Sequence, residues 1–308
     1  MKRYARRLTV AMAVIGACVL AAPLKGQIQS SIPIPFDTGQ NVAPVFEGWE
    51  ANPDGSFSMV FGYLNRNYKE EPEIPIGPDN SIEPGGPDQG QPTHFYPRRQ
   101  QFMFKVRVPA DFGKKEMTWT LTRNGKTDKA VGSLVMEYEL SDLVLAQNRG
   151  GGSADGATMK ANKAPTVTID APAQQTVAVG TGLTLTASAS DDGNPEPRKR
   201  PAPQSTRKPD AGPPPLVTIR TSTPRTQQVV KPNQDGLAVT WTHYRGPGKA
   251  TFDPMSALVK DGKATTKVSF SHPGKHQIRA YADDGILLGT ADVTITVTGS
   301  PSTSSNQP

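Results

Sequence analysis

The chain of 308 residues has a formal net charge of +6 and a single cysteine. Five of these charges belong to the first 26 residues, which contain no acid, so the remainder carries only +1. This balance argues against a nucleic-acid partner and against attraction to an anionic membrane surface. Because the cysteine is Cys18, a chain cleaved after residue 26 could form no disulfide. Its stability would have to come from hydrophobic cores of ordinary domain size.

Residues 1–26 have the pattern of a secretory signal peptide. Four basic residues precede an uncharged apolar stretch, Leu8 to Ala22, which is too short to span a bilayer. The proline after Ala22 disfavours cleavage there, so we predict cleavage before Gln27. The expected location is the periplasm, the cell surface or the extracellular space. No later segment is apolar enough to predict a membrane span.

Two other export signals fit the same residues. A lipoprotein signal would end at Cys18, and a twin-arginine signal would use Arg6 and Arg7. The apolar run continues past Cys18, where a polar tether is usual, so the ordinary secretory signal is the preferred interpretation.

The region 42–146 is predicted to form a β-sandwich. Apolar and polar residues alternate in three segments bounded by turn residues, 56–61, 101–109 and 116–122. Asn124-Gly125 then favours a type I′ hairpin, because both central residues of that turn need positive φ. Between the first two segments lies a long loop, 69–99, rich in Pro, Gly, Asp and Gln. Loops of that length are usually functional or disordered.

Residues 147–163 include three consecutive glycines and are predicted to be a flexible linker. A second β-sandwich is expected over 164–298, where alternation returns on both sides of an insertion at 194–235. The insertion holds many prolines, with eight basic and three acidic residues. We therefore predict that it is disordered and that trypsin cuts at Arg198–Lys208 before it cuts the flanking strands. Residues 299–308 are expected to form a disordered tail.

The second region resembles the PKD-like and bacterial immunoglobulin-like modules of surface and secreted proteins. The likeness is carried, in order, by 165-PTVTI-169, the strand ending at Asp191-Asp192-Gly193, the Trp241 strand with 246-GPGKATF-252, and 274-GKHQIRAYADDG-285. It covers under half of the chain and implies a seven-stranded sandwich that serves as a spacer, an adhesion module or a carbohydrate-associated module. The PKD signature Trp-Asp-Phe-Gly-Asp-Gly is replaced by 241-WTHY-244. The first region resembles no family of known function.

The candidate ligand-binding residues lie in 90-GQPTHFYPRR-99, within the long loop. His94, Tyr96, Arg98 and Arg99 crowd a possible base, an aromatic ring and two cations into six positions. The alternative is a loop that only anchors its aromatic rings on the sandwich.

Sugar stacking is a second use for aromatic side chains in and near this loop. The candidates are Trp49, Tyr63, Tyr68, Phe95 and Tyr96. Aromatic residues of a sandwich more often lie in its core than form a binding platform. Trp241 is expected to be the buried tryptophan of the second core.

Two Asp-Asp-Gly turns suggest a calcium site. In the predicted topology they emerge at the same end of the second sandwich, so Asp191, Asp192, Asp283 and Asp284 should approach one another. Ca²⁺ accepts six to eight oxygen ligands in flexible geometry and is the natural counter-ion outside the cytosol. The alternative is two solvated turns, since Asp-Gly is a common hairpin dipeptide. No other cofactor is predicted.

No catalytic or cofactor motif is present. His272 and His276 are four residues apart, but Pro273 and Gly274 between them predict a turn instead of a helical metal pair. We therefore predict an exported, non-enzymatic structural or adhesive protein of the cell envelope or extracellular space. Its partner would be a polysaccharide or another envelope protein. A carbohydrate-binding accessory protein is the alternative, and a polysaccharide-active enzyme with carboxylates outside any motif is the third interpretation.

Overall fold

The computed structural model describes residues 36–149, 156–172, 174–197, 228–233 and 235–299. All of them belong to one compact unit, Phe36–Pro308. The predicted signal peptide, trypsin-sensitive segment and tail from residue 300 lie outside the described residues. No helix of the described part is long and apolar enough to cross a membrane.

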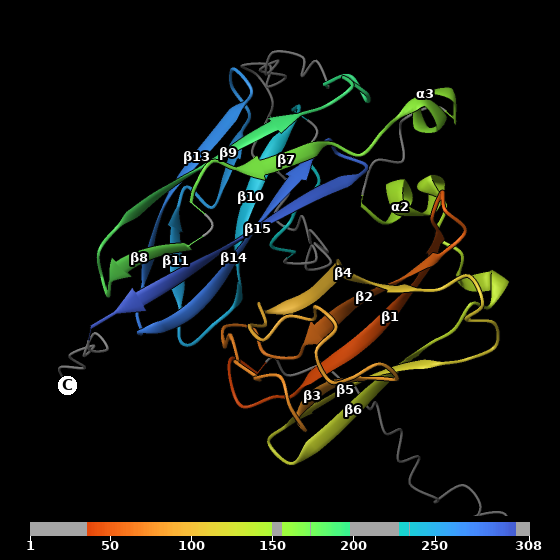
Figure 1. Ribbon diagram of the computed structural model, residues 1–308, viewed down its shortest axis with the longest axis horizontal. Helices are drawn as coiled ribbons and strands as arrows, with labels where there is room; N and C mark the ends of the chain where they lie inside the picture. The colour runs from red at the N-terminus through yellow and green to blue at the C-terminus, as the bar shows by residue number, and fades with distance from the viewer. Residues whose placement is uncertain (1–35, 150–155, 173, 198–227, 234, 300–308) are drawn as a thin grey trace, which may run out of the picture. The chain divides into compact units, whose positions relative to one another are not determined.

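The first sandwich consists of two three-stranded antiparallel sheets (Figure 1). One has the order β1-β2-β4, formed by Val42–Ala51, Phe57–Asn65 and Arg98–Val108. The other has the order β3-β5-β6, formed by Asn80–Glu83, Met117–Arg123 and Lys126–Gly132. The strands predicted at 56–61, 101–109 and 116–122 are confirmed as β2, β4 and β5.

The hairpin predicted at Asn124-Gly125 joins β5 to β6, and both residues have positive φ, 52° and 72°. Trp119 on β5 is fully buried between the sheets, where its ring meets Phe104 edge-on at 5.0 Å. The indole N–H donates to Asn80 Oδ1 at 3.0 Å, so burial of Trp119 leaves its one polar atom paired.

Buried side-chain amides organise the long loop between β2 and β4. Asn80, at the start of β3, donates through Nδ2 to the carbonyls of Ile74 and Pro92, both at 2.9 Å. Gln91 likewise donates to the carbonyl of Pro87 at 2.6 Å. These amides pair backbone oxygens that would otherwise be buried without a partner, a role that backbone ladders usually fill. The loop is thereby held against the sandwich.

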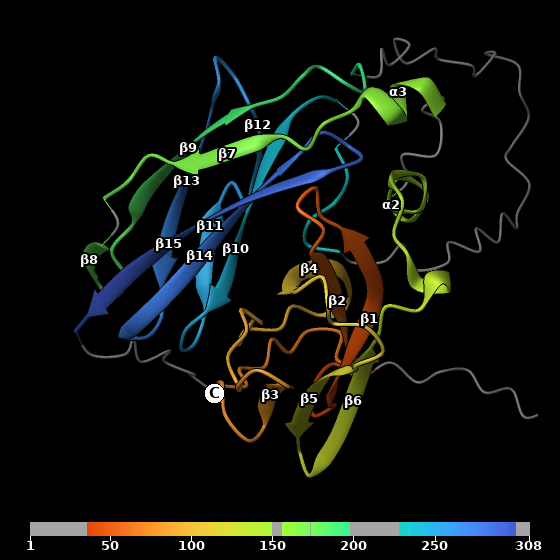
Figure 2. The same ribbon diagram turned by 45° about the vertical axis from the view of Figure 1, so that its right-hand side comes forward.

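The second sandwich has the strand order of an immunoglobulin-like fold. Its first sheet runs β11-β13-β9-β7, formed by Ala250–Asp253, Lys263–Phe270, Leu183–Ser190 and Thr166–Ile169. Its second runs β12-β10-β14-β15-β8, formed by Ser256–Leu258, Ala238–Arg245, Gly274–Asp283, Leu288–Thr298 and Gln174–Ala178. The two sheets face each other in Figure 2.

Chain order explains this assignment. The first and third strands of this sandwich, β7 and β9, share a sheet with β13, while β10, β14 and β15 belong to the other, as in the two sheets of immunoglobulin domains. The edge strand β8 pairs in parallel with β15. Trp241 on β10 is fully buried in the core of this sandwich. The predicted buried tryptophan is therefore confirmed.

Short helices follow the first sandwich. They are η1 (Met136–Tyr138), α2 (Asp142–Asn148) and α3 (Gly156–Ala161). Ser141 caps α2 by accepting the Val144 N–H at 3.4 Å. The described parts of 147–163, predicted as a flexible linker, thus include the end of α2 and all of α3. Helices of six or seven residues are too short to show an apolar period, which is why the sequence pattern missed them.

Candidate functional site

Contacts between the two sandwiches form the most distinctive site of the described chain. Strand β10 is buried along nearly its whole length, because Trp241 faces the second core while Tyr244 joins the core cluster of the first sandwich. Tyr281 on β14 also belongs to that first cluster. We call the contacts of β10 and β14 with β4 and the 71–97 loop the seam.

Tyrosine hydroxyls supply many of the hydrogen bonds of the seam. Tyr281 donates to the carbonyl of Met103 at 3.0 Å, and Tyr244 donates to that of Gly90 at 2.6 Å. Tyr96 accepts the His243 N–H at 2.8 Å. All three tyrosines are buried, so their rings contribute apolar contact while each hydroxyl has a partner.

Two arginines extend the seam at its edges. The Arg279 guanidinium lies 3.6 Å from the centre of the Tyr244 ring and bonds to Asp292 at 2.7 and 2.8 Å. Arg245 binds Asp88 in the loop through two bonds of 2.8 and 3.1 Å. Planar two-point pairing of this kind fixes orientation more tightly than a single lysine contact.

Three histidines form a buried stack in the seam. His94 comes from the loop, His243 from β10 and His276 from β14. The ring centres are 4.6 Å apart for His94 and His243, and 5.1 Å apart for His243 and His276. His243 Nε2 and His276 Nδ1 are 3.1 Å apart, so one of these two nitrogens donates a proton to the other. At the loop end, His94 Nε2 lies 3.1 Å from Glu71 Oε2.

Burial decides the charge of the inner histidines. It lowers the pKa of His243 well below its ordinary value, and positive charge on His94 or His276 would lower it further. Burial also lowers the pKa of His276. Burial alone would raise the pKa of Glu71, but the bond to His94 and the charges of His94 and Lys249 lower it overall. The lowered pKa values of His243 and His276 keep these two inner rings neutral near pH 7.

The predicted ligand-binding residues have protein partners. His94 and Tyr96 lie together in the seam with ring centres 5.1 Å apart. Arg98 instead lies over the Tyr68 ring at 4.1 Å and donates to the Arg66 carbonyl. Arg99 pairs with Glu47 at 2.6 Å. The four residues do not form one open group, and a ligand for them stays a prediction.

The aromatic residues suggested for sugar stacking are mostly core residues. Four of them are buried, namely Trp49, Tyr63, Phe95 and Tyr96. Tyr68 is half-buried beneath Arg98, so it alone of the five offers part of its surface to a ligand.

The carboxylates proposed for calcium also have protein donors. Asp283 is buried and forms an ion pair with Arg149, and Asp284 accepts from the Ile286 and Leu287 N–H groups and from Asn162. Burial raises the pKa of Asp283, and it raises that of Asp284 to about 6.

The other two aspartates sit in local turns. Asp191 accepts the Gly193 N–H, and Asp192 accepts those of Lys163 and Asn194. The consecutive residues Asn162 and Lys163 donate to Asp284 and Asp192, so the two Asp-Asp-Gly turns lie near each other. Negative charge on Asp191 adds to the raised pKa of Asp284. Within the described ranges no group of three or more His, Cys, Asp or Glu side chains is arranged to hold a metal ion.

The sequence did not reveal that three of its four histidines meet. His94 and His243 are separated by 149 positions, and only pairing of β10 with β14 brings His243 beside His276. The turn predicted at Pro273-Gly274 fits the observed start of β14 at Gly274. The one available signal was the adjacent pair His243-Tyr244 on β10.

Comparison with known proteins gives only distant structural matches. No family model matches the chain, and no curated protein does. Fibronectin(III)-like modules of CbhA from Clostridium thermocellum are 13% identical, covering 87% of this chain and 92% of theirs, with a TM-score of 0.23. The Yersinia pseudotuberculosis adhesin InvE is 13% identical, covering 84% and 59%, with a TM-score of 0.24. The D00-D0 domain of intimin is 12% identical, covering 83% and 99%, with a TM-score of 0.23.

At such TM-scores these matches carry no argument about function. The immunoglobulin-like assignment rests on the strand order described above. That strand order does not distinguish a PKD-like module from other immunoglobulin-like modules.

Proposed function

We propose that the chain is an exported, non-enzymatic structural or adhesive protein in which two β-sandwiches, 42–146 and 164–298, act as one rigid element. The second sandwich would be a PKD-like or bacterial immunoglobulin-like module. The observation that supports this proposal is the seam, whose buried tyrosines and arginines join the second sandwich to the core of the first.

A spacer or adhesion module must hold its ends in a fixed relation under load. Interfaces between domains of one chain are usually small and polar, and they permit relative motion. The seam instead combines apolar burial with directed hydrogen bonds, and its histidines are engaged with one another and with Glu71. Side chains used in this way serve cohesion, which favours a structural role over a catalytic one.

Binding of the fluorescently labelled full chain tests this function. We expect retention on intact envelopes of the source cell, loss of that retention when surface proteins are removed by protease, and no binding to a glycan array. Array binding that is lost in Tyr68→Ala would replace the proposal with the carbohydrate-binding alternative. No retention on either target would contradict both.

Calcium is a separate proposal for the two Asp-Asp-Gly turns. A cation there would have to compete with Arg149 for Asp283 and with Asn162 for Asp284. Thermal melts in excess Ca²⁺ and in chelator test it, because a ligand at about 100 times its dissociation constant stabilises by about 2.7 kcal/mol. Identical melting temperatures with Ca²⁺ and with chelator at low salt would exclude a calcium site at these turns.

A further inference from the structure

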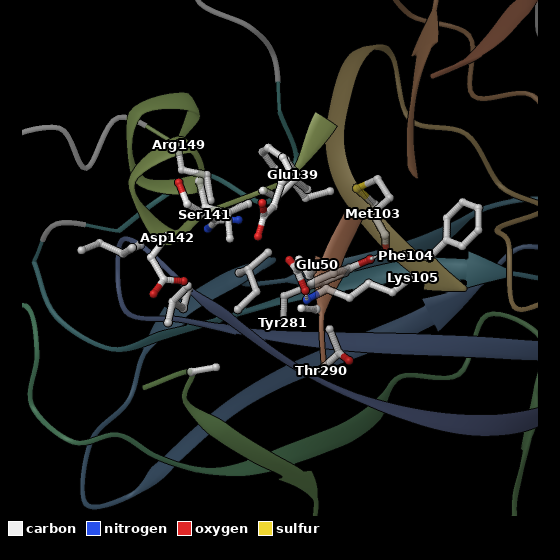
Figure 3. A pocket seen from close by; sticks show the side chains of 18 of the residues that line it. Glu50, Met103, Phe104, Lys105, Glu139, Ser141, Asp142, Arg149, Tyr281 and Thr290 are labelled. Atoms are coloured by element: carbon white, nitrogen blue, oxygen red, sulfur yellow. Dashed lines mark hydrogen bonds and ion pairs between the residues drawn. The ribbon is translucent and has the colours of Figure 1, made fainter. Parts of the chain in front are cut away.

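A pocket of about 940 Å³ lies beside the seam, outside the histidine stack (Figure 3). Its walls come from the end of β1, the middle of β4, the η1–α2 segment and the β14–β15 hairpin. That volume is at the upper end of the range for small-molecule sites, which often lie where two domains meet.

The walls of this pocket are mostly apolar. Buried side chains of both sandwiches contribute to it, among them Met103 and Phe104 on β4 and Ile286 in the β14–β15 hairpin. Leu145 on α2 and Leu287 add half-buried surface. A ligand with an apolar body would therefore replace water over these walls with favourable contact.

The charges that line the pocket are unbalanced. Each of its three basic residues already has a carboxylate partner, since Lys105 pairs with Glu50 at 2.5 Å, Arg149 with Asp283, and Arg279 with Asp292. Glu139 and Asp142 also line the pocket. They are exposed, and neither has an ion-pair partner in the described part of the chain. Figure 3 shows both carboxylates on the α2 side of the pocket.

The pocket also contains a buried hydrogen-bond donor without an acceptor in the described chain, on Arg149. Arg149 is 6% exposed and lines the pocket, and its Nε–H has no acceptor among the described residues, although its Nη2 pairs with Asp283. A buried N–H of this kind gains free energy when a ligand supplies an oxygen. A neutral acceptor suits it, because Asp283 already balances the charge of Arg149.

From these three features we propose that the pocket binds a ligand that combines an apolar body, a neutral carbonyl oxygen and a cationic group. The apolar body would lie against β4 and the β14–β15 hairpin, the carbonyl would accept from Arg149, and the cation would lie near Glu139 and Asp142. An acylated amine and a peptide with leucine and lysine side chains share this chemistry.

Titration calorimetry with three matched amides tests the charge preference on the full chain. The probes are N-octanoylethylenediamine, N-octanoylethanolamine and N-octanoyl-β-alanine, which differ only in a cationic, neutral or anionic end. We expect the cationic amide to bind most tightly and the anionic one most weakly. Acetyl-Leu-Lys-amide, run alongside, identifies the source: tighter binding than the acyl amine indicates a peptide ligand, and weaker binding indicates an acylated amine.

Two variants test whether the preference for the cationic amide arises in the pocket. The double variant Glu139→Gln with Asp142→Asn should weaken the cationic amide about fivefold and leave the neutral one unchanged. Glu137→Gln is the matched control, because Glu137 is exposed on η1 but does not line the pocket. Ala51→Trp, at an exposed position of the lining, should weaken all three amides by filling the mouth. Equal binding of the cationic and anionic amides, or no effect of Ala51→Trp, would overturn the proposal.

Discussion

Trp241 shows how one residue anchors the second sandwich. Its side chain is fully buried in that core. Trp241→Ala should lower the free energy of unfolding by about 3–5 kcal/mol, because the substitution removes apolar contact and leaves a cavity. Urea denaturation measures the change. Leu258→Ala is the control, since Leu258 is 41% exposed and its truncation should cost less than about 0.5 kcal/mol. Equal losses in the two variants would show that Trp241 is not a core residue.

The raised pKa of Asp284 makes the stability of the folded chain depend on pH, and the sign of that dependence follows from the direction of the shift. Its pKa is raised to about 6 in the folded chain, mainly by burial, so the folded state holds a proton that the unfolded state has released. The contribution of Asp284 to stability is therefore fully present below about pH 4 and is lost as pH rises to about 6. Asp284→Asn keeps an oxygen acceptor for Ile286 and Leu287 without this titration.

The measurement is the difference in unfolding free energy between Asp284→Asn and the unsubstituted chain from pH 4 to 7. We expect that difference to shift in favour of the variant as pH rises. Asp111→Asn, at an exposed loop position, should show no such trend. A flat difference for Asp284→Asn would mean that its carboxyl titrates as it does in the unfolded chain.

At the scale of elements, the histidine stack joins β10, β14 and the long loop, and its pH dependence has the opposite sign. The pKa values of His243 and His276 are lowered by burial, so the unfolded chain takes up protons first as pH falls. Stability contributed by the neutral rings is present above about pH 6.5 and is lost below it. The groups facing the stack, Glu71, Tyr96 and His272, include one carboxylate, and that carboxylate contacts the His94 ring and neither of the other two.

His243→Phe tests this element. We expect the unsubstituted chain to lose stability between pH 7.5 and pH 5 with a slope of up to about 1.4 kcal/mol per pH unit for each histidine that stays neutral. The variant should have a shallower slope even if its stability at pH 7.5 is lower. His272→Phe, at an exposed position beside the stack, serves as control. Parallel slopes for the variant and the unsubstituted chain would exclude His243 as a titrating group.

Much of this element structure could be predicted from the sequence. Alternation identified β2, β4, β5 and β10, and Asn124-Gly125 identified a hairpin, because these signals depend on neighbours along the chain. The site could not be predicted in the same way. His94 and Tyr96 were singled out, but both contact His243, and the His94 N–H donates to the Tyr244 carbonyl; these partners lie about 150 positions away. Only the packing of one sandwich against the other defines that contact.

The end of the predicted insertion also makes a contact with a distant segment that the sequence pattern did not predict. Its residues 198–227 lie outside the described chain, whereas Val230 is buried in the core cluster of the first sandwich. The Val229 N–H donates to Gln100 Oε1 on β4 at 2.9 Å. The Pro-rich and charged composition of 194–235 gave no sign of this contact, because a single short apolar pair shows no period.

At the scale of the whole molecule, the seam should make the two sandwiches unfold together. Tyr281→Phe removes a hydroxyl that donates to Met103 O but retains the ring. The expected cost is about 1 kcal/mol, and it should fall on both sandwiches alike. Hydrogen exchange of amides in β5 and β13 measures this, one strand from each sandwich. Faster exchange confined to β13 would show that the sandwiches are energetically independent.

The central claim is that the seam fixes the two sandwiches as one rigid element, and a distance between spin labels tests it most directly. Cys18 is the only cysteine, so Cys18→Ser with Lys126→Cys and Lys267→Cys places one label on each sandwich at exposed positions. Double electron–electron resonance at pH 7.5 should give a single narrow distance distribution, and Tyr96→Phe combined with Tyr281→Phe should broaden it. A broad distribution in the chain with its seam intact would contradict the account.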